Sequence, residues 1–254
     1  MSEHRQILID ELNAAFVAAT LPNRLRLLRK AVSGRIVFTT SLGVEDQAVT
    51  HAVADSKVDF DVVTLDTGRL FPETYDVWQR TEEKYALRIK AYSPKAEAIE
   101  ALVADQGING FYYGLDMRKA CCEIRKVEPL ARALAGADIW VTGLRGDQNA
   151  HRSHLRFVEW DAERGLIKAN PLLDFSRDDV VTYAKANDVP VNALHEQGFV
   201  SIGCAPCTRA IKPGESERAG RWWWESEDKK ECGLHVAADG RVSRAKETES
   251  EAAE

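Results

Sequence analysis

Residues 35–46 read RIVFTT followed by SLGVED, and apolar residues then continue at helical spacing to Ala54. The first six residues predict a short buried strand, and the spacing after them predicts a helix. A strand, a small-residue turn and a helix in this order place unpaired amides at the positive end of the helix dipole, where anions bind. The segment therefore indicates an α/β fold with a phosphate-binding loop, and an ordinary strand-to-helix connection is the alternative.

The same strand–loop–helix unit recurs along the chain. A second strand is predicted at residues 60–65, and it ends in DTGR before a helix that Pro72 opens. Polar loop residues after the carboxyl end of a strand are where open α/β sheets bind ligands. The alternation predicts a mostly parallel sheet with helices on both faces. Its remaining members are strands at residues 87–92 and 138–142 and helices at residues 95–105 and 119–135.

Further elements are predicted outside this alternation. They are a helix pair over residues 5–33 divided at Leu21-Pro22, an edge hairpin made of residues 155–160 and 166–169, and a helix from Ser176 to Asn187. From Leu194 onward, glycine, proline, tryptophan and charged residues mix without regular spacing. We expect one domain over residues 1–236 with an irregular arm at 210–236, and a disordered acidic tail over 237–254.

The composition limits the classes of molecule that this protein is expected to bind. The chain has 254 residues and a formal net charge of −6. Broad nucleic-acid binding needs a basic surface, so no nucleic-acid partner is expected. No apolar run approaches the length of a membrane span, and residues 1–10 lack the apolar region of a secretory signal. We therefore expect a cytoplasmic protein without a membrane partner.

Four of the five cysteines form two close pairs. Cys204 and Cys207 are a C-x-x-C, which alone fits a redox pair, half of a zinc site or part of an iron–sulfur site. Cys121 and Cys122 are adjacent, whereas structural zinc sites favour a spacer of two to four residues between ligands. Adjacent thiolates can bind different irons of a cubane cluster. The two pairs together favour a cluster, with zinc or unliganded thiols as alternatives.

The fifth cysteine, Cys232, stands in the segment KKECGLH at residues 229–235. Cations near a cysteine stabilise the thiolate, which is the reactive form. The glycine that follows Cys232 leaves room for a bulky reaction partner at the sulfur. From this setting Cys232 is a candidate nucleophile, and an inert thiol is the alternative.

Four segments together resemble the assimilatory adenylyl-sulfate (APS) reductases of the APS/PAPS reductase, or sulfonucleotide reductase, family. They are CCEIRKV at 121–127, IGCAPCT at 202–208, GRWWWE at 220–225 and KECGLH at 230–235, and the resemblance covers about residues 30–236. It implies an adenine nucleotide α-hydrolase-like fold of the PP-loop type. Family members with both cysteine pairs bind a [4Fe-4S] cluster through them and use APS. The resemblance therefore implies a cluster held by Cys121, Cys122, Cys204 and Cys207.

The resemblance also implies the chemistry. Cys232 matches the nucleophile, whose thiolate attacks the sulfur of APS, releases AMP and becomes a cysteine S-sulfonate. Thioredoxin or glutaredoxin then releases sulfite by thiol exchange, and a homo-oligomer is expected. AMP leaves readily when cations neutralise its phosphate. The substrate-binding residues implied in this way are Ser41, Gly43, Leu65, Thr67, Gly68, Lys126, Arg145, Arg152, Arg218, Arg221, Trp222 and His235.

The chain departs from its relatives at two places. Residues 40–46 read TSLGVED where relatives often have a Ser-Gly pair, and Gly146 stands where many have a second basic residue after Arg145. We expect either that Arg152 supplies this charge or that selectivity against a 3′-phosphate is lower. For Trp223 and Trp224 we favour a role as apolar anchors of the C-terminal segment.

Three alternative functions remain open. One is a reductase of the 3′-phosphorylated substrate, PAPS, that retains the cluster. A second is a zinc-containing PP-loop enzyme that uses ATP to transfer a nucleotidyl or thiol group. The third, a binding module without catalysis, leaves the Cys232 motif unexplained.

Overall fold

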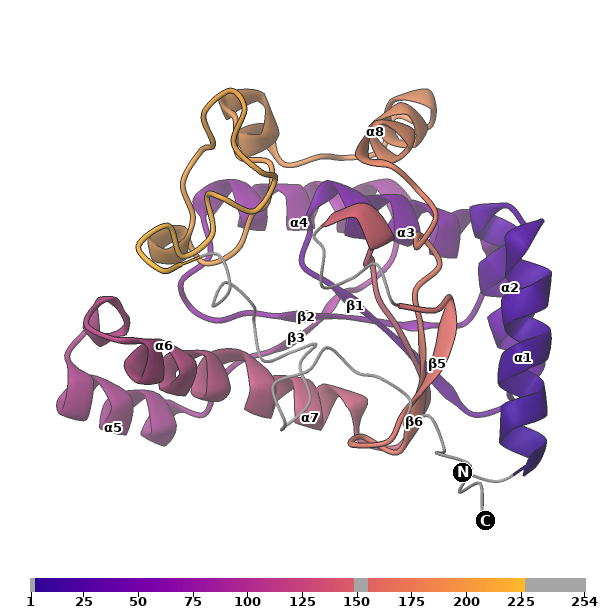
Figure 1. Cartoon of the computed structure of the whole chain (residues 1–254), viewed down its shortest axis with the longest axis horizontal. Coiled ribbons are helices and arrows are strands. Elements are labelled where there is room, and N and C mark those ends of the chain that lie inside the picture. The colour runs from indigo at the N-terminus through magenta and orange to yellow at the C-terminus, as the bar shows by residue number, and fades with distance from the viewer. Residues whose placement is uncertain (1–2, 149–154, 227–254) are drawn as a thin grey trace, which may run out of the picture.

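The computed structural model describes residues 3–148 and 155–226, and its strands form one six-stranded sheet in the order β3-β2-β1-β4-β6-β5 (Figure 1). Every neighbouring pair is parallel except β5 and β6, which form the predicted edge hairpin. The expectation of a mostly parallel sheet is confirmed. The strands are β1 Arg35–Thr40, β2 Asp61–Leu65, β3 Lys90–Tyr92, β4 Ala137–Val141, β5 Val158–Asp161 and β6 Leu166–Ala169.

Helices cover both faces of this sheet because its buried strands alternate two apolar surfaces. Ile36 and Phe38 of β1 belong to a large core that includes residues of α1, α2, α3, α4 and α8. Val37 points the other way and packs with Trp140 and with Leu130 of α7. Figure 1 shows α3, α4 and α8 on one side of the strands and α5, α6 and α7 on the other.

The helix bounds follow the sequence signals closely. Pro22 and Pro72 lie in the first turns of α2 and α4, where a missing N–H costs nothing. Ser176 caps α8 in a capping box with Asp179. The helices are α1 Glu3–Val17, α2 Leu21–Ala31, α3 Val44–Ser56, α4 Pro72–Tyr85, α5 Ala96–Gln106, α6 Leu115–Cys122, α7 Glu128–Leu134 and α8 Arg177–Ala186.

Strand β3 is shorter than the sequence predicted. Pairing with β2 begins only at Lys90, opposite Val63, although a strand was expected from residue 87. The backbone N–H of Ile89 donates instead to Oε1 of Glu82 at 2.8 Å. The Ile89 N–H is therefore bonded to a side chain and is not available for the backbone hydrogen bond that a longer strand would form with β2.

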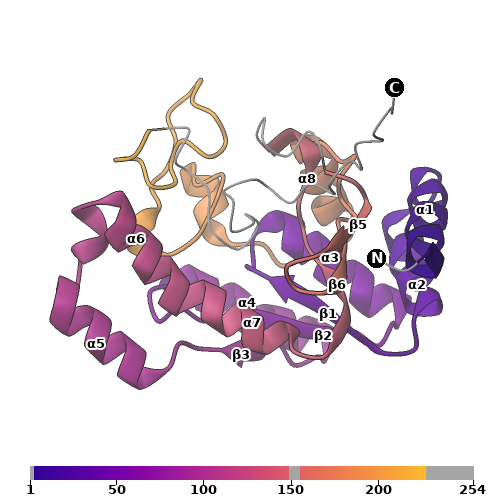
Figure 2. The same ribbon diagram turned by 60° about the horizontal axis from the view of Figure 1, so that its bottom comes forward.

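The helix predicted over residues 119–135 begins earlier, at Leu115, and contains a π-helical turn at Glu123–Val127 between α6 and α7. Pro129 has no backbone N–H, so the carbonyl four residues before it lacks its usual helical donor. Such a turn is a frequent feature of functional sites. Here it directly follows Cys121 and Cys122, and α6 and α7 still run on as one rod in Figure 2.

The C-terminal segment is irregular, as expected. Within its described part it holds two short 3₁₀ turns, Ala193–Gln197 and Ala205–Cys207, and an isolated antiparallel bridge between Thr208 and Arg221. The last part of the expected arm, residues 227–236, and the expected tail lie outside the described residues. No helix in the described part of the chain is long and apolar enough to cross a membrane.

Candidate active site

A cavity of about 210 Å³ opens at the carboxyl ends of β1, β2 and β4. From β1 the sheet continues through β2 and β3 on one side and through β4 on the other, so the cavity lies where the strand order reverses. Open α/β sheets bind their ligands at this point. The C-terminal segment closes one side of the cavity with residues 200–203, 217–218 and 221–222, all of them more than 150 positions after β1.

The loop after β1 borders the cavity, and the polar groups of Ser41 in this loop bond to the carboxylate of Asp46. Ser41 donates to Oδ2 of Asp46 through its backbone N–H and its hydroxyl, both at 2.6 Å. Gly43 precedes the first turn of α3. Ser41, Gly43 and Asp46 all line the cavity, so the loop that the sequence predicts to bind phosphate borders it. Gly143 fits against Asp46, since a Cβ there would lie 2.0 Å from its Oδ1.

The loop after β2 lies on the same cavity. Leu65 and Thr67 line it, whereas Gly68 is adjacent to them and is not part of the lining. Gly68 has a φ of +68°, a conformation that glycine adopts without strain, and its N–H donates to Asp66 at 3.0 Å. Gly68 therefore shapes the turn that presents Thr67.

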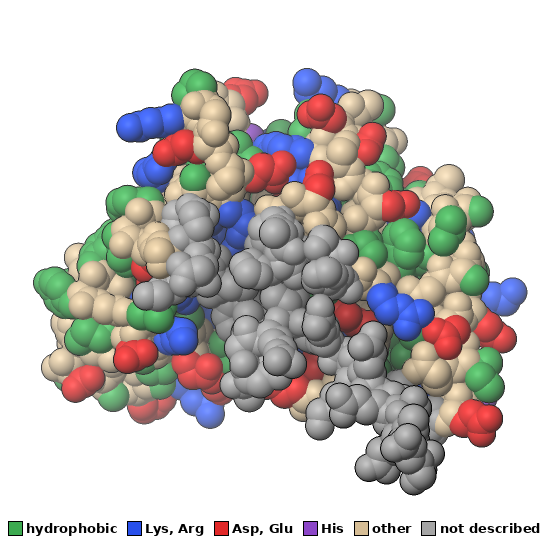
Figure 3. All heavy atoms as spheres, in the orientation of Figure 1, with side chains coloured by type: hydrophobic (Ala, Val, Ile, Leu, Met, Phe, Trp, Pro, Cys, Tyr) green, Lys and Arg blue, Asp and Glu red, His purple; other side chains and the backbone are tan. Residues whose placement is uncertain are grey.

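Three of the predicted cations reach the cavity: Lys126, Arg218 and Arg221. Gly203 makes room for Arg221, because a Cβ on Gly203 would lie 2.3 Å from the guanidinium. Acidic groups share the cavity with these cations, notably Glu45, Asp46 and Glu217. On the face drawn in Figure 3 basic and acidic side chains are likewise interspersed. The site is thus suited to an anion held by placed cations rather than by a wide basic surface.

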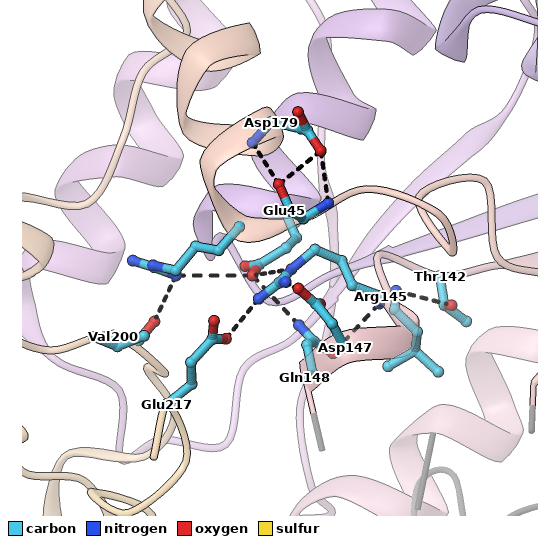
Figure 4. Close-up of polar contacts among 11 residues, drawn as sticks. Glu45, Thr142, Arg145, Asp147, Gln148, Asp179, Val200 and Glu217 are labelled. Atoms are coloured by element: carbon cyan, nitrogen blue, oxygen red, sulfur yellow. Dashed lines mark hydrogen bonds and ion pairs between the residues drawn. The ribbon is translucent and has the colours of Figure 1, made fainter. Parts of the chain in front are cut away.

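Arg145 is placed behind the cavity wall rather than in its lining. Its side chain has no exposed surface, and its guanidinium pairs with Glu45 at 3.1 Å, with Glu217 at 2.5 Å and with Asp147 (Figure 4). Burial lowers the pKa of Arg145, but the three carboxylates outweigh it and raise the pKa overall. In this structure Arg145 positions two cavity-lining glutamates, Glu45 and Glu217, which sequence reasoning did not single out.

The four paired cysteines come together around a second pocket beside the cavity. Cys204 and Cys207 are buried with Phe111 and Trp222, and Cys121 and Cys122 pack against this cluster. All four thiols are free of disulfide bonds. The thiols surround the pocket rather than meet at one point. Among the described residues, no three His, Cys, Asp or Glu side chains converge tightly enough to share a single metal ion.

Two arginines of the same helical rod face the vicinal cysteines. Arg125, four residues after Cys121, contacts its thiol, and Arg118, four residues before Cys122, contacts the other. Burial raises the pKa of Cys121, while the Arg125 charge opposes the shift. Burial also raises the pKa of Cys207 to about 12. Cys121 and Cys207 therefore favour the protonated form without a metal, and the arginines offset the charge of the thiolates that a metal requires.

The cavity and the cysteine pocket share a wall. Lys126, Arg221 and Trp222 line both. Trp222 is 1% exposed and has a φ of +41°. The guanidinium carbons of Arg118 and Arg221 are each 4.7 Å from the centroid of its ring. A bulky residue at positive φ is strained and needs support from its surroundings. The structure thus holds Trp222 at the boundary between the two sites.

Trp223 and Trp224 have the anchoring role proposed from the sequence. The Trp224 ring packs edge-on against Tyr112 at 4.5 Å and against Trp223 at 4.8 Å. Glu225, directly after them, forms a buried ion pair with Arg118 at 2.8 Å. These contacts fix the C-terminal segment beside the cysteine pocket. The remaining predicted residues Arg152, Cys232 and His235 lie outside the described residues.

Comparisons with known proteins identify the family. The profile of the phosphoadenosine phosphosulfate reductase domain matches residues 35–210. The chain belongs to this family. A relative from Sinorhizobium fredii (strain USDA 257) is 53% identical over 89% of this chain and 90% of its own length, and one from Neisseria meningitidis serogroup B is 49% identical over 78% and 81%. Both are named adenosine 5′-phosphosulfate reductase.

Solved structures agree with the family and the fold. The phosphoadenylyl-sulfate reductase of Candida auris superposes with a TM-score of 0.69 at 26% identity, covering 83% of this chain and 98% of that protein. The FMN adenylyltransferase of Candida glabrata, at 14% identity and a TM-score of 0.52, covers 82% and 75% and shares the fold alone. The PP-loop fold expected for a sulfonucleotide reductase is confirmed, and the chain is an oxidoreductase of that family.

Proposed function

We propose that this sulfonucleotide reductase reduces APS to sulfite and AMP with thioredoxin or glutaredoxin as reductant, in the assimilation of sulfate into cysteine. The observation that carries the proposal is that four thiols from two distant pairs surround one pocket that shares Lys126, Arg221 and Trp222 with the cavity at the strand ends. We propose that these thiols, of Cys121, Cys122, Cys204 and Cys207, hold a [4Fe-4S] cluster.

In the proposed reaction the Cys232 thiolate attacks the sulfate sulfur of APS. An S–S bond forms, the S–O bond to the phosphate breaks, and the electron pair leaves with AMP. A thiolate of the reductant then attacks Sγ of Cys232, and sulfite departs with the S–S electron pair, which leaves a mixed disulfide. The second thiol of the reductant attacks that mixed disulfide, closes the reductant's own disulfide and releases Cys232 as a thiolate. The two electrons that reduce the sulfur thus come from the dithiol.

The cations of the cavity would stabilise AMP as the leaving group. Charge builds on the AMP phosphate as the S–O bond breaks, and Lys126, Arg218 and Arg221 are the basic side chains in the described lining. Fixed cations in a site that excludes water stabilise such charge strongly. The cluster, when bound, would add fixed charge next to Lys126 and so bias where this ammonium points. His235 and Arg152 are proposed to add to the same charge.

APS is the proposed substrate because the relatives from Sinorhizobium fredii and Neisseria meningitidis carry that name at about half identity. The Candida auris structure is named for PAPS at a much lower identity. The carboxylates Glu45, Asp46 and Glu217 in the cavity lining also disfavour an additional phosphate on the nucleotide. PAPS remains the second candidate, because Gly146 lacks the basic side chain found in many relatives.

The test is an anaerobic preparation analysed for iron and acid-labile sulfide and assayed with APS and PAPS side by side. We expect a brown protein, a higher kcat/KM for APS, and an intact mass that gains one sulfonate group after APS is added without reductant. Cys232→Ser should keep the iron and lose the adduct, whereas Cys204→Ser should lose the iron. A colourless protein with zinc and ATP turnover would overturn the proposal.

A further inference from the structure

Residues 209–220 form a loop of the C-terminal segment that borders the cavity. The antiparallel bridge between Thr208 and Arg221 closes the base of this loop. Shortly after the base, Glu225 forms its buried ion pair with Arg118, which lines the cysteine pocket. The base of the loop is therefore fixed on the side of the molecule that carries the cysteine pocket.

Inside this loop, a tight turn carries two of the cations that line the cavity. The backbone N–H of Ala219 donates to the carbonyl oxygen of Ser216 at 3.0 Å. The N–H of Arg221 donates in the same way to the carbonyl oxygen of Arg218 at 2.9 Å. Arg218 and Arg221 both line the cavity, and Glu217 belongs to the same turn. A contact that fixes Glu217 therefore also fixes the backbone from which the two arginines extend.

The carboxylate of Glu217 bonds to the opposite side of the cavity. Its Oε2 lies 2.5 Å from Nη2 of Arg145, which also pairs with Glu45 at the start of α3 (Figure 4). The cysteine pocket borders the loop after β2, because Arg69 of that loop lines it. Arg145 follows β4, on the other side of β1. The ion pair thus joins the loop to the side of the cavity that faces its base.

The surroundings of Arg145 suit it to hold this carboxylate. Its side chain has no exposed surface, and the carboxylates of Glu45, Asp147 and Glu217 surround its guanidinium. A guanidinium with three carboxylate partners has little positive charge left for a phosphate. Asp147 belongs to the same loop as Arg145, whereas Glu217 comes from a segment 72 positions away in the sequence. Glu217 is therefore the partner through which Arg145 holds the C-terminal segment.

We propose that the Arg145–Glu217 pair is a clasp that closes the C-terminal segment across the cavity and sets Arg218 and Arg221 against the phosphate of the bound nucleotide. Glu217 is then a positioning residue, which strengthens the binding of an anion although its own charge repels anions. The proposal rests on the proposed function in taking an anionic nucleotide as the ligand.

Hydrogen exchange and calorimetry on the full-length protein test the clasp. Without ligand, Glu217→Ala should speed exchange of the Ala219 and Arg221 amides about 10-fold and leave exchange in β1 at the wild-type rate. The same variant should bind AMP about 10-fold more weakly and should bind adenosine, which lacks the phosphate, with unchanged affinity. Removal of a negative charge without a clasp predicts the opposite result, tighter binding of AMP.

Asp147→Ala is the matched control. It also removes one carboxylate from Arg145, but Asp147 does not line the cavity and does not belong to the C-terminal segment. This variant should keep the wild-type exchange rates of the loop and the wild-type affinity for AMP. Glu217→Gln keeps an acceptor for Arg145 and should recover most of both effects. Glu217→Asp is one methylene shorter, so it should share the loss, and it replaces the alanine variant if that variant does not fold.

Three results would overturn the proposal. They are equal exchange rates in Glu217→Ala and Asp147→Ala, tighter binding of AMP by Glu217→Ala, and equal losses of affinity for AMP and adenosine. If the wild type does not bind AMP, the proposed function fails instead. The exchange rates measured without ligand then still decide whether Arg145 and Glu217 act as a clasp.

Discussion

The hydroxyl of Thr67 lies 3.3 Å from Sγ of Cys204. Thr67 follows β2 and lines the cavity at the carboxyl ends of the strands, and Cys204 lines the cysteine pocket. The carbonyl of Thr67 also accepts from Nη1 of Arg125 at 2.6 Å, and Arg125 faces Cys121. One short loop thus contacts both pockets, so we expect a metal held by the cysteines to influence the substrate site through adjacent side chains.

Thr67→Val tests this contact because it removes the hydroxyl and keeps the shape. Loss of the hydroxyl leaves Cys204 without its hydrogen-bond partner, and groups around metal ligands commonly account for 10- to 100-fold in metal affinity or activity. We expect faster loss of the brown colour in air and lower kcat/KM for APS. Thr67→Ser keeps the hydroxyl and should behave as the wild type. Equal iron retention and activity in both variants would contradict the expectation.

Lys126→Met tests the cation shared by the two sites. Lys126 lines both the cavity and the cysteine pocket. Removing a charge that stabilises the leaving phosphate should slow sulfonation of Cys232 by about 100-fold. Rapid-quench mass spectrometry measures that rate, and iron content should stay at the wild-type level. Lys119→Met, on the exposed side of α6, is the control and should sulfonate normally. An unchanged rate in Lys126→Met would refute the role.

Glu225→Ala tests the buried ion pair that fixes the C-terminal segment. The side chains of Arg118 and Glu225 are 1% and 7% exposed and 2.8 Å apart. Removing one partner leaves a buried charge uncompensated, so unfolding should require about 3 kcal/mol less free energy. Urea denaturation measures the difference. Asp76→Ala, in the exposed pair with Arg80, should cost less than about 1 kcal/mol. Similar costs for both variants would argue against the Arg118–Glu225 anchor.

The stability of the protein should fall between pH 7.5 and 5.5. Burial is the largest cause that lowers the pKa of His51 and of His195 below the ordinary value of 6.5. Asp55 and Asn187 oppose the shift at His51, and Lys84 adds to it. As the pH falls through 6.5 the unfolded chain takes up protons first, so the free energy of unfolding decreases.

Urea midpoints at both pH values measure this decrease. Carboxylates titrate at lower pH and contribute little in this window. His51→Asn should show a smaller loss of stability than the wild type, since it removes one of the two groups. A loss of the same size in His51→Asn would exclude His51 as a contributor.

Much of the fold was predictable because its signals are local. The apolar run of β1, the proline at the start of α4 and the capping box at Ser176 act within a few positions of the chain. Two departures from the predicted elements have causes that the apolar pattern does not show. Glu82 takes the Ile89 amide and shortens β3, and a π-helical turn interrupts the helix around Pro129.

The sequence by itself determined the cysteine pairs and the strand-end loops that line the two pockets, because these are short motifs at the carboxyl edge of a parallel sheet. Only the tertiary structure decided how they act. It placed Arg145 behind Glu45 and Glu217 and brought Glu225 to Arg118. These partners are separated by up to 107 positions, and distant side chains meet through packing, which local periodicity does not encode.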